Sequence, residues 1–285
     1  MIRKVLGIDL ASAKWSSVGS ATIEFDDAAN AFTRVVAGAI RWPEGVLTPD
    51  ALADAIDAFA RRKGVCAVAL DGPQGWRDPA TPEGTRGVGR RCEYQCRTQG
   101  KTGAYPRTFP GTQRAWIEFC VEVFAGLLAR PGVVLSDPAA AADAASSYVV
   151  LECFPTSAWR SSGLIPLPGK AKRPDLARYL KTLVTTYGLP PTTARTHDDL
   201  QAVVAALTAV GAVGGPAVAA PKGVVASMIA IPGGLPIRIE GYIWDVKPLE
   251  LRARKTLAPP QTALAIVRAP GRRRSRRARR RPIRC

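Results

Sequence analysis

The sequence contains very little histidine, and its cysteines are few and scattered. His197 is the only histidine, and six cysteines are spread over 285 residues. A zinc site needs several nitrogen or sulfur ligands at suitable spacing, and Cys92 and Cys96 form the only closely spaced pair. We therefore expect free thiols, which are buried where they lie in apolar runs, as do Cys66 and Cys153. The sequence also offers no convincing Ser-His or Cys-His nucleophile pair.

We also find no pattern that is typical of a signal peptide or of a membrane-spanning helix. The opening MIRKVLGIDLAS reaches Asp9 after a few apolar positions, which is too soon for a signal peptide. The longest stretch of low charge, residues 202–220, is rich in Ala and Gly and follows a helix-like opening. We interpret it as a buried helix and loop rather than a membrane span. These features predict a soluble cytoplasmic protein.

Acidic residues are absent from residue 251 onward, where the sequence has 13 Lys and Arg residues. The net charge of +17 therefore falls to +4 for the preceding residues, so the high sequence pI describes mainly this tail. We predict a single domain over residues 1–250, because 47% hydrophobic residues suffice for a core, and a disordered Arg-rich tail over residues 251–285. The tail should be attracted to polyanions. Functional nucleic-acid binding and a non-conserved or out-of-frame extension are both open interpretations.

The hydrophobic pattern alternates between strand-like and helix-like segments without any internal repeat. Short apolar or alternating runs predict strands at 5–10, 15–25, 32–42, 65–73, 146–155 and 233–246. Apolar residues at helical spacing predict helices at 49–63, 114–129, 174–187 and 198–210. Thr48 and Gly64 are suited to cap the first of these helices. Residues 72–114 are rich in Gly, Pro and Arg and have little periodicity, which is typical of a functional or mobile segment. The sequence therefore predicts an α/β fold.

Three acidic residues interrupt or end strands that are otherwise too apolar to hold a charge. They are Asp9, Asp71 and Glu152. A carboxylate in such surroundings is unfavourable unless it is paired, hydrogen-bonded or bound to a cation. Several such carboxylates favour Mg²⁺ or Mn²⁺, which prefer oxygen ligands. The alternative is that each residue only caps a strand end or a turn.

Five motifs occur in an order that is typical of a known family. They are GIDLA at 7–11, ALDGPQG at 69–75, RRCE at 90–93, LECFPTSAW at 151–159 and HDDLQAVVAALTA at 197–209. Together they resemble the domain of unknown function 429 family, whose members are predicted nucleases with a ribonuclease H-like fold. The resemblance spans roughly residues 3–245. It implies a ribonuclease H-like mixed β-sheet flanked by helices.

The resemblance also implies a shared metal site made of four carboxylates. Asp9 and Asp71 would bind the metal from neighbouring strand ends, and Glu152 would be a further ligand or would hold a metal-bound water. Asp198 would complete the site from the start of a helix. The family's helix motif has a second acid where this chain has Gln201, which offers a carbonyl oxygen without charge. Asp199 lies about 100° further round the helix than Asp198, so we expect it to be a poor substitute.

The activity implied by these residues is phosphodiester hydrolysis with one or two Mg²⁺ or Mn²⁺ ions. His197 adjoins Asp198 and is a candidate proton shuttle. The alternative is that His197 is only a neighbour of the helix cap.

Candidate substrate-binding residues follow the strand acids. Arg91 and Glu93 match the family's Arg-x-acid element, and Arg97 lies close to them. These arginines can bind a phosphate group through paired hydrogen bonds. The alternative is that an Arg–Glu pair holds the irregular segment of residues 72–114 in place. Lys170 and Lys172 lie where the family carries a lysine. The long segment also carries aromatic residues that can stack on bases or anchor it to the core: Trp76, Tyr105 and Phe109.

The leading hypothesis is therefore a metal-dependent nuclease whose partner is nucleic acid. The sequence leaves open whether the substrate is DNA or RNA, and it does not define an oligomeric state. A second hypothesis is a phosphotransferase of the actin-like and sugar-kinase class, because GIDLAS can open a phosphate-binding hairpin. A third is a non-catalytic nucleic-acid-binding relative that has kept the fold, for which Gln201 is the best support.

Overall fold

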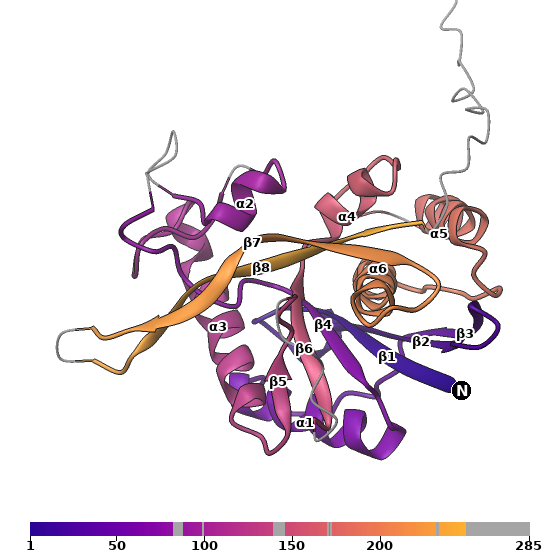
Figure 1. Cartoon of the computed structure of the whole chain (residues 1–285), viewed down its shortest axis with the longest axis horizontal. Coiled ribbons are helices and arrows are strands. Elements are labelled where there is room, and N and C mark those ends of the chain that lie inside the picture. Colours follow the sequence, from indigo (N-terminus) through magenta and orange to yellow (C-terminus); the bar gives the residue numbers. More distant parts are fainter. Residues whose placement is uncertain are drawn as a thin grey trace, which may run out of the picture. The chain divides into compact units, whose positions relative to one another are not determined.

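Short apolar segments form the strands of one mixed sheet, and helices lie between them in the chain (Figure 1). The computed structural model describes residues 1–81, 88–98, 100–138, 146–169, 171, 173–231 and 234–248. The Arg-rich tail and both candidate lysines, Lys170 and Lys172, lie outside these residues. The strands are β1 (Ile2–Asp9), β2 (Gly19–Asp26), β3 (Ala31–Ala37), β4 (Ala67–Asp71), β5 (Val133–Leu135), β6 (Tyr148–Cys153), β7 (Val218–Ile229) and β8 (Ile237–Lys247). The helices are α1 (Pro49–Lys63), α2 (Arg91–Gln95), α3 (Arg114–Leu128), α4 (Pro155–Ser161), α5 (Arg173–Tyr187) and α6 (His197–Ala212), with short 3₁₀ turns at Trp15–Ser17 and Gly111–Gln113.

The sheet combines a meander with parallel strands. Its order is β3-β2-β1-β4-β6-β8-β7, and the short β5 also pairs with β6. Strand β1 is antiparallel to β2 and parallel to β4, and β4 and β8 each run parallel to β6. The prediction of an α/β fold with a mixed sheet flanked by helices is thereby confirmed. The arrangement is compatible with a ribonuclease H-like fold.

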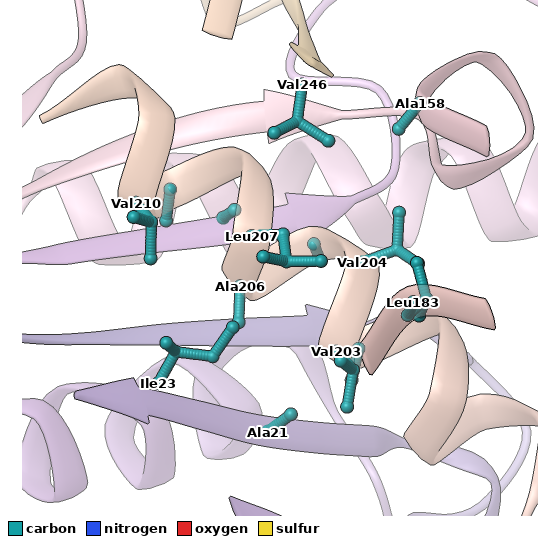
Figure 2. Close-up of a cluster of buried hydrophobic side chains, with 14 of the residues drawn as sticks. Ala21, Ile23, Ala158, Leu183, Val203, Val204, Ala206, Leu207, Val210 and Val246 are labelled. Atoms are coloured by element: carbon teal, nitrogen blue, oxygen red, sulfur yellow. The ribbon is translucent and has the colours of Figure 1, made fainter. Parts of the chain in front are cut away.

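Helices cover both faces of the sheet, so its central strands are buried on two sides. Helix α6 packs on β1 and β2, and α1 and α3 pack together on the opposite face (Figure 1). Figure 2 shows Val203, Ala206 and Val210 of α6 close to Ala21 and Ile23 of β2. Because both faces are apolar, the strands have continuous rather than alternating hydrophobic sequences.

The caps predicted for α1 are present. The Thr48 side chain accepts a hydrogen bond from the Ala51 amide, and Gly64 ends the helix in the left-handed conformation with φ 61°. None of the described helices is long and apolar enough to cross a membrane.

Several elements differ from the sequence prediction. Strand β2 begins only at Gly19, because Trp15–Ser17 forms a 3₁₀ turn, and β3 already ends at Ala37. Strand β7 was not predicted: residues 202–220 were interpreted as helix and loop, whereas α6 ends at Ala212 and β7 begins at Val218. Strand β7 pairs with β8 as a long antiparallel hairpin, with a register shift between Val224 and Ser227. Helix α4 and strand β5 were also absent from the predicted order.

Candidate active site at the carboxyl ends of strands β1 and β4

Asp9 and Asp71 lie side by side, because each is the last residue of its strand. Strands β1 and β4 are parallel, and their register pairs Asp9 with Asp71. The preceding residues Ile8 and Leu70 belong to the core beneath α1 and α3. Since side chains alternate along a strand, the two aspartates face the opposite side of the sheet, toward α6.

The two carboxyl groups are hydrogen-bonded to each other. Burial raises the pKa of Asp9 well above its ordinary value, and the adjacent Asp71 raises it further. Burial also raises the pKa of Asp71 to about 6, although Lys101 and the hydrogen bond with Asp9 oppose this rise. In the described part of the chain, no arginine or lysine forms an ion pair with either carboxyl group. The hydrogen bond between the two carboxyl groups requires that one of them carries a proton, and the raised pKa values favour this.

Two glycines allow the start of α6 to approach this pair. Gly19 is paired with Asp9 across β1 and β2, and a Cβ atom at Gly19 would overlap the backbone of Asp198. A Cβ atom at Gly7 would likewise overlap the backbone of α6 around Ala202 and Ala206. The absence of side chains at these two positions lets α6 lie directly on the sheet.

Both acidic residues in the first turn of α6 act on Asp9. The charges of Asp198 and Asp199 raise the pKa of Asp9, in addition to the larger effects of burial and Asp71. The helix begins after Thr196, whose side chain accepts a hydrogen bond from the Asp199 amide. The charge of Asp199 has the smallest of these effects on Asp9, and its carboxylate lies close to Gly38 at the end of β3. The prediction that Asp199 is a poor substitute for the missing acid stays a prediction.

Gln201 is part of the core rather than of an open ligand shell. Its side chain is 8% exposed, and its Oε1 accepts a hydrogen bond of 2.9 Å from the indole Nε1 of Trp159 in α4. The carbonyl oxygen that was predicted to be available for a metal is therefore engaged by Trp159. The residue fixes α4 against α6.

Glu152 lies in β6, one residue before the position in register with Asp71; it lines the same cavity as Asp71, and its charge raises the pKa of Asp71. Its register partner in β4 is Leu70, whose side chain belongs to the α1 and α3 face. The residue of β6 in register with Asp71 is instead Cys153, which is buried. The side chain at the register position of Asp71 is therefore a thiol, and the role predicted for Glu152 as a metal ligand stays a prediction.

A buried ion pair occupies the carboxylate of Glu152. The guanidinium of Arg90 donates from Nη2 to Oε1 at 2.5 Å and from Nη1 to Oε2 at 2.8 Å, and the Gln74 amide donates to Oε2 at 2.9 Å. Arg90 is 1% exposed and Glu152 is 3% exposed. Burial raises the pKa of Glu152, and Arg90 opposes that rise. The bidentate geometry is that of a structural salt bridge.

Arg90, rather than Arg91, is the arginine that the fold buries. The Arg91 side chain is exposed, and its amide donates to the carboxylate of Glu240. Arg97 is exposed and has a positive φ of 54°. The alternative that we left open, an Arg–Glu pair that pins the long segment, is realised by Arg90, which also interacts with Glu93.

Lys101 is a site residue that the sequence analysis missed. Its Nζ lies 5.0 Å from the ring centroid of Trp116 and 5.6 Å from that of Phe154, and its charge acts on Asp71. Together with Asp71 and Glu152 it lines a cavity of about 30 Å³. No periodicity marks residues 72–114, so only the folded arrangement reveals this lysine.

The other predicted residues have mixed environments. His197 is half-buried next to Asp198, and its Nδ1 has no hydrogen-bond partner among the described residues. Trp76 is 1% exposed and makes an edge-to-face contact with Tyr105 at 5.1 Å, which is an anchoring role. Phe109 is exposed. All five described cysteines are free, as predicted.

The donor set fits a hard divalent cation only in part. Among the described residues, no three His, Cys, Asp or Glu side chains are grouped closely enough to hold a metal ion. Asp9 and Asp71 do supply adjacent carboxyl oxygens, which are the ligands preferred by Mg²⁺ and Mn²⁺. When both carboxyl groups are ionised they repel each other. A cation bound between them would remove this repulsion, as a proton between them does.

Comparisons of the chain with protein-family models, with curated proteins and with solved structures find no match. The five-motif resemblance therefore stays a prediction. Any functional conclusion has to be drawn from the geometry around Asp9 and Asp71.

Proposed function

We propose that this protein is a metal-dependent nuclease that hydrolyses phosphodiester bonds of DNA or RNA and binds Mg²⁺ or Mn²⁺ through Asp9 and Asp71. The observation that carries the proposal is the hydrogen-bonded pair formed by these two carboxyl groups, neither of which forms an ion pair with a lysine or arginine among the described residues. Such a pair gains stability when a divalent cation replaces its proton. Asp198 and Asp199 add negative charge on the same side of the sheet.

Each of these residues has a definite task in the proposed reaction. Asp9 and Asp71 bind the ion after they release their shared proton, so ion binding weakens at acidic pH. Asp198 and Asp199 strengthen the electrostatic attraction for the ion from the first turn of α6. A bound ion would supply positive charge to the phosphate during in-line attack by water. His197 stays the candidate proton shuttle.

A cleavage assay on the full chain tests the proposal. The substrates are single-stranded, double-stranded and branched DNA and the corresponding RNAs, each with Mg²⁺ or Mn²⁺. We expect metal-dependent cleavage that is lost in Asp9→Asn and in Asp71→Asn. The matched control is Asp54→Asn, because Asp54 is an exposed acid of α1 that pairs with Arg130. It should cleave like the parent.

The proposal is wrong if the parent protein cleaves none of these substrates with either ion, or if the two aspartate variants cleave as well as the control. Retention of nucleic-acid binding without cleavage would support the non-catalytic alternative. Turnover of ATP without cleavage would support the phosphotransferase alternative. Comparison of DNA with RNA in the same panel identifies the substrate class.

A further inference from the structure

Two positions that would supply ligands to a second metal ion are unavailable in this fold. A pair of catalytic ions about 4 Å apart needs carboxylates on both sides of a bridging aspartate. The predicted site supplied these from Glu152 and Asp198, and the family carries a second helix acid where this chain has Gln201. The side chains of Glu152 and Gln201 have other partners here.

Glu152 cannot turn to a metal without disrupting the core. Both of its oxygens accept hydrogen bonds from Arg90, and Oε2 also accepts one from the Gln74 amide. Withdrawing this carboxylate would leave the guanidinium of Arg90, which is 1% exposed, with Glu93 as its remaining acidic partner. Breaking a buried ion pair is strongly unfavourable. Arg90 therefore neutralises the negative charge that Glu152 would otherwise offer to a metal ion.

Gln201 adds no charge, and its oxygen accepts the indole hydrogen of Trp159 at 2.9 Å. The acids that remain near the aspartate pair are Asp198 and Asp199, which both come from the first turn of α6 and act on Asp9. The negative charge that is not already paired with Arg90 therefore comes from these two acids, on the Asp9 side of the pair.

A positive side chain lies on the other side of the pair, next to Asp71. The ammonium group of Lys101 is close to the rings of Trp116 and Phe154. The Lys101 amide donates to the carboxylate of Glu93 at 2.9 Å, so its backbone is fixed as well. Trp116 is itself anchored, because its Nε1 donates to the carbonyl oxygen of Leu10 at 3.1 Å.

The space beside Lys101 is small. The cavity lined by Lys101, Asp71 and Glu152 measures about 30 Å³, and Arg90 and Phe154 line it as well. A lysine ammonium is a compact point charge, and aromatic rings stabilise it without neutralising it.

We infer that this site holds one divalent cation rather than two, and that the ammonium group of Lys101 supplies the second positive charge, for a phosphate oxygen of the substrate. The inference rests on the proposed function, since it assigns the charges of the same site. Lys101 is exposed. Its ammonium group can therefore contact a substrate phosphate as well as interact with Asp71.

The test is the stoichiometry and affinity of Mn²⁺ binding, measured by calorimetry and by electron paramagnetic resonance on the full chain without substrate. We expect one Mn²⁺ per chain and no spectral signature of two coupled ions. In Lys101→Ala, loss of a nearby positive charge should tighten Mn²⁺ binding about three- to tenfold, whereas cleavage should fall at least about tenfold. Lys101→Arg should retain most of the cleavage.

The matched control is Lys63→Ala, an exposed lysine at the end of α1, which should change neither Mn²⁺ affinity nor cleavage. Two Mn²⁺ ions per chain with cleavage intact would overturn the single-ion inference and leave the proposed function standing. Unchanged Mn²⁺ affinity and cleavage in Lys101→Ala would also overturn the inference. A parent chain that binds no Mn²⁺ would overturn both.

Discussion

Replacing Asp9 by asparagine should stabilise the metal-free protein at neutral and alkaline pH and should remove its stabilisation by Mg²⁺. The side-chain amide that Asp9→Asn introduces can donate to the Asp71 carboxylate at every pH, whereas the shared proton of the native pair does so only below its pKa. The variant therefore keeps the hydrogen bond while it removes one of two like charges.

The size of the effect comes from the charge of Asp9, because burial and the adjacent Asp71 raise the pKa of Asp9 well above its ordinary value. Two like unit charges a few ångströms apart repel by roughly 4 kcal/mol at an effective dielectric constant of about 20. The carboxyl groups lie at strand ends and are partly exposed, so solvent screening reduces this to about 1–2 kcal/mol. For a domain of this size that corresponds to roughly 2–8 °C in Tm.

The sign of the pH dependence is fixed by the direction of the pKa change. A carboxyl group whose folded pKa is raised stabilises the fold below its unfolded pKa, and this contribution is lost as the pH rises through the folded value. The metal-free parent should therefore lose stability relative to Asp9→Asn as the pH rises from about 4 through the folded pKa of Asp9. Addition of Mg²⁺ should recover that loss in the parent alone.

Thermal unfolding followed by circular dichroism, with EDTA or with Mg²⁺ across this pH range, measures the effect. Asp54→Asn serves as the control because it removes an exposed acid far from the pair in sequence. Equal Tm profiles for the parent and Asp9→Asn, together with equal shifts on adding Mg²⁺, would refute the shared-proton pair as the metal site.

Three further changes test the scaffold around the site. Gly19→Ala should lower stability by about 1–3 kcal/mol and weaken Mn²⁺ binding, because a methyl group there meets the backbone of Asp198; calorimetry and thermal unfolding measure both effects. Arg90→Met should cost about 3–5 kcal/mol because it leaves Glu152 buried without its main counter-ion, and Glu152→Gln in the same chain should recover part of this in a denaturant-based double-mutant cycle. Thr48→Ala should cost about 1 kcal/mol by removing the α1 cap, with no change in Mn²⁺ affinity.

The sequence predicted the elements with strong local signals. The α1 boundaries follow from a side-chain cap at Thr48 and a left-handed Gly64, both of which are local chemistry. Strand β7 has no such signal, because Pro221 and Gly223 interrupt its pattern. An edge strand tolerates both residues, since one of its sides has no ladder to maintain. Pairing with β8, a long-range effect, decides its conformation.

Lys101 and Arg90 lie in the irregular segment between β4 and α3, where neither periodicity nor caps indicate which side chains turn inward. The family element directed attention to Arg91, which is exposed, whereas its neighbour carries the ion pair. A shift of one residue at the start of the short helix α2 is enough to exchange the two arginines. Such a difference is beyond the accuracy with which sequence patterns define a helix end.

The salt bridge of Glu152 is a feature that the sequence did not reveal, because it depends on the face of a strand. Asp9 and Asp71 face α6 since their register places them one residue after Ile8 and Leu70, whereas Glu152 is in register with Leu70 itself. In a strand buried on one face, alternation of polar and apolar residues would reveal this. Strand β6 is apolar on both faces, with Leu151 packed on one side and Val150 on the other. Its sequence therefore carries no record of which side faces α6, and only the fold shows that the Glu152 carboxylate pairs with Arg90.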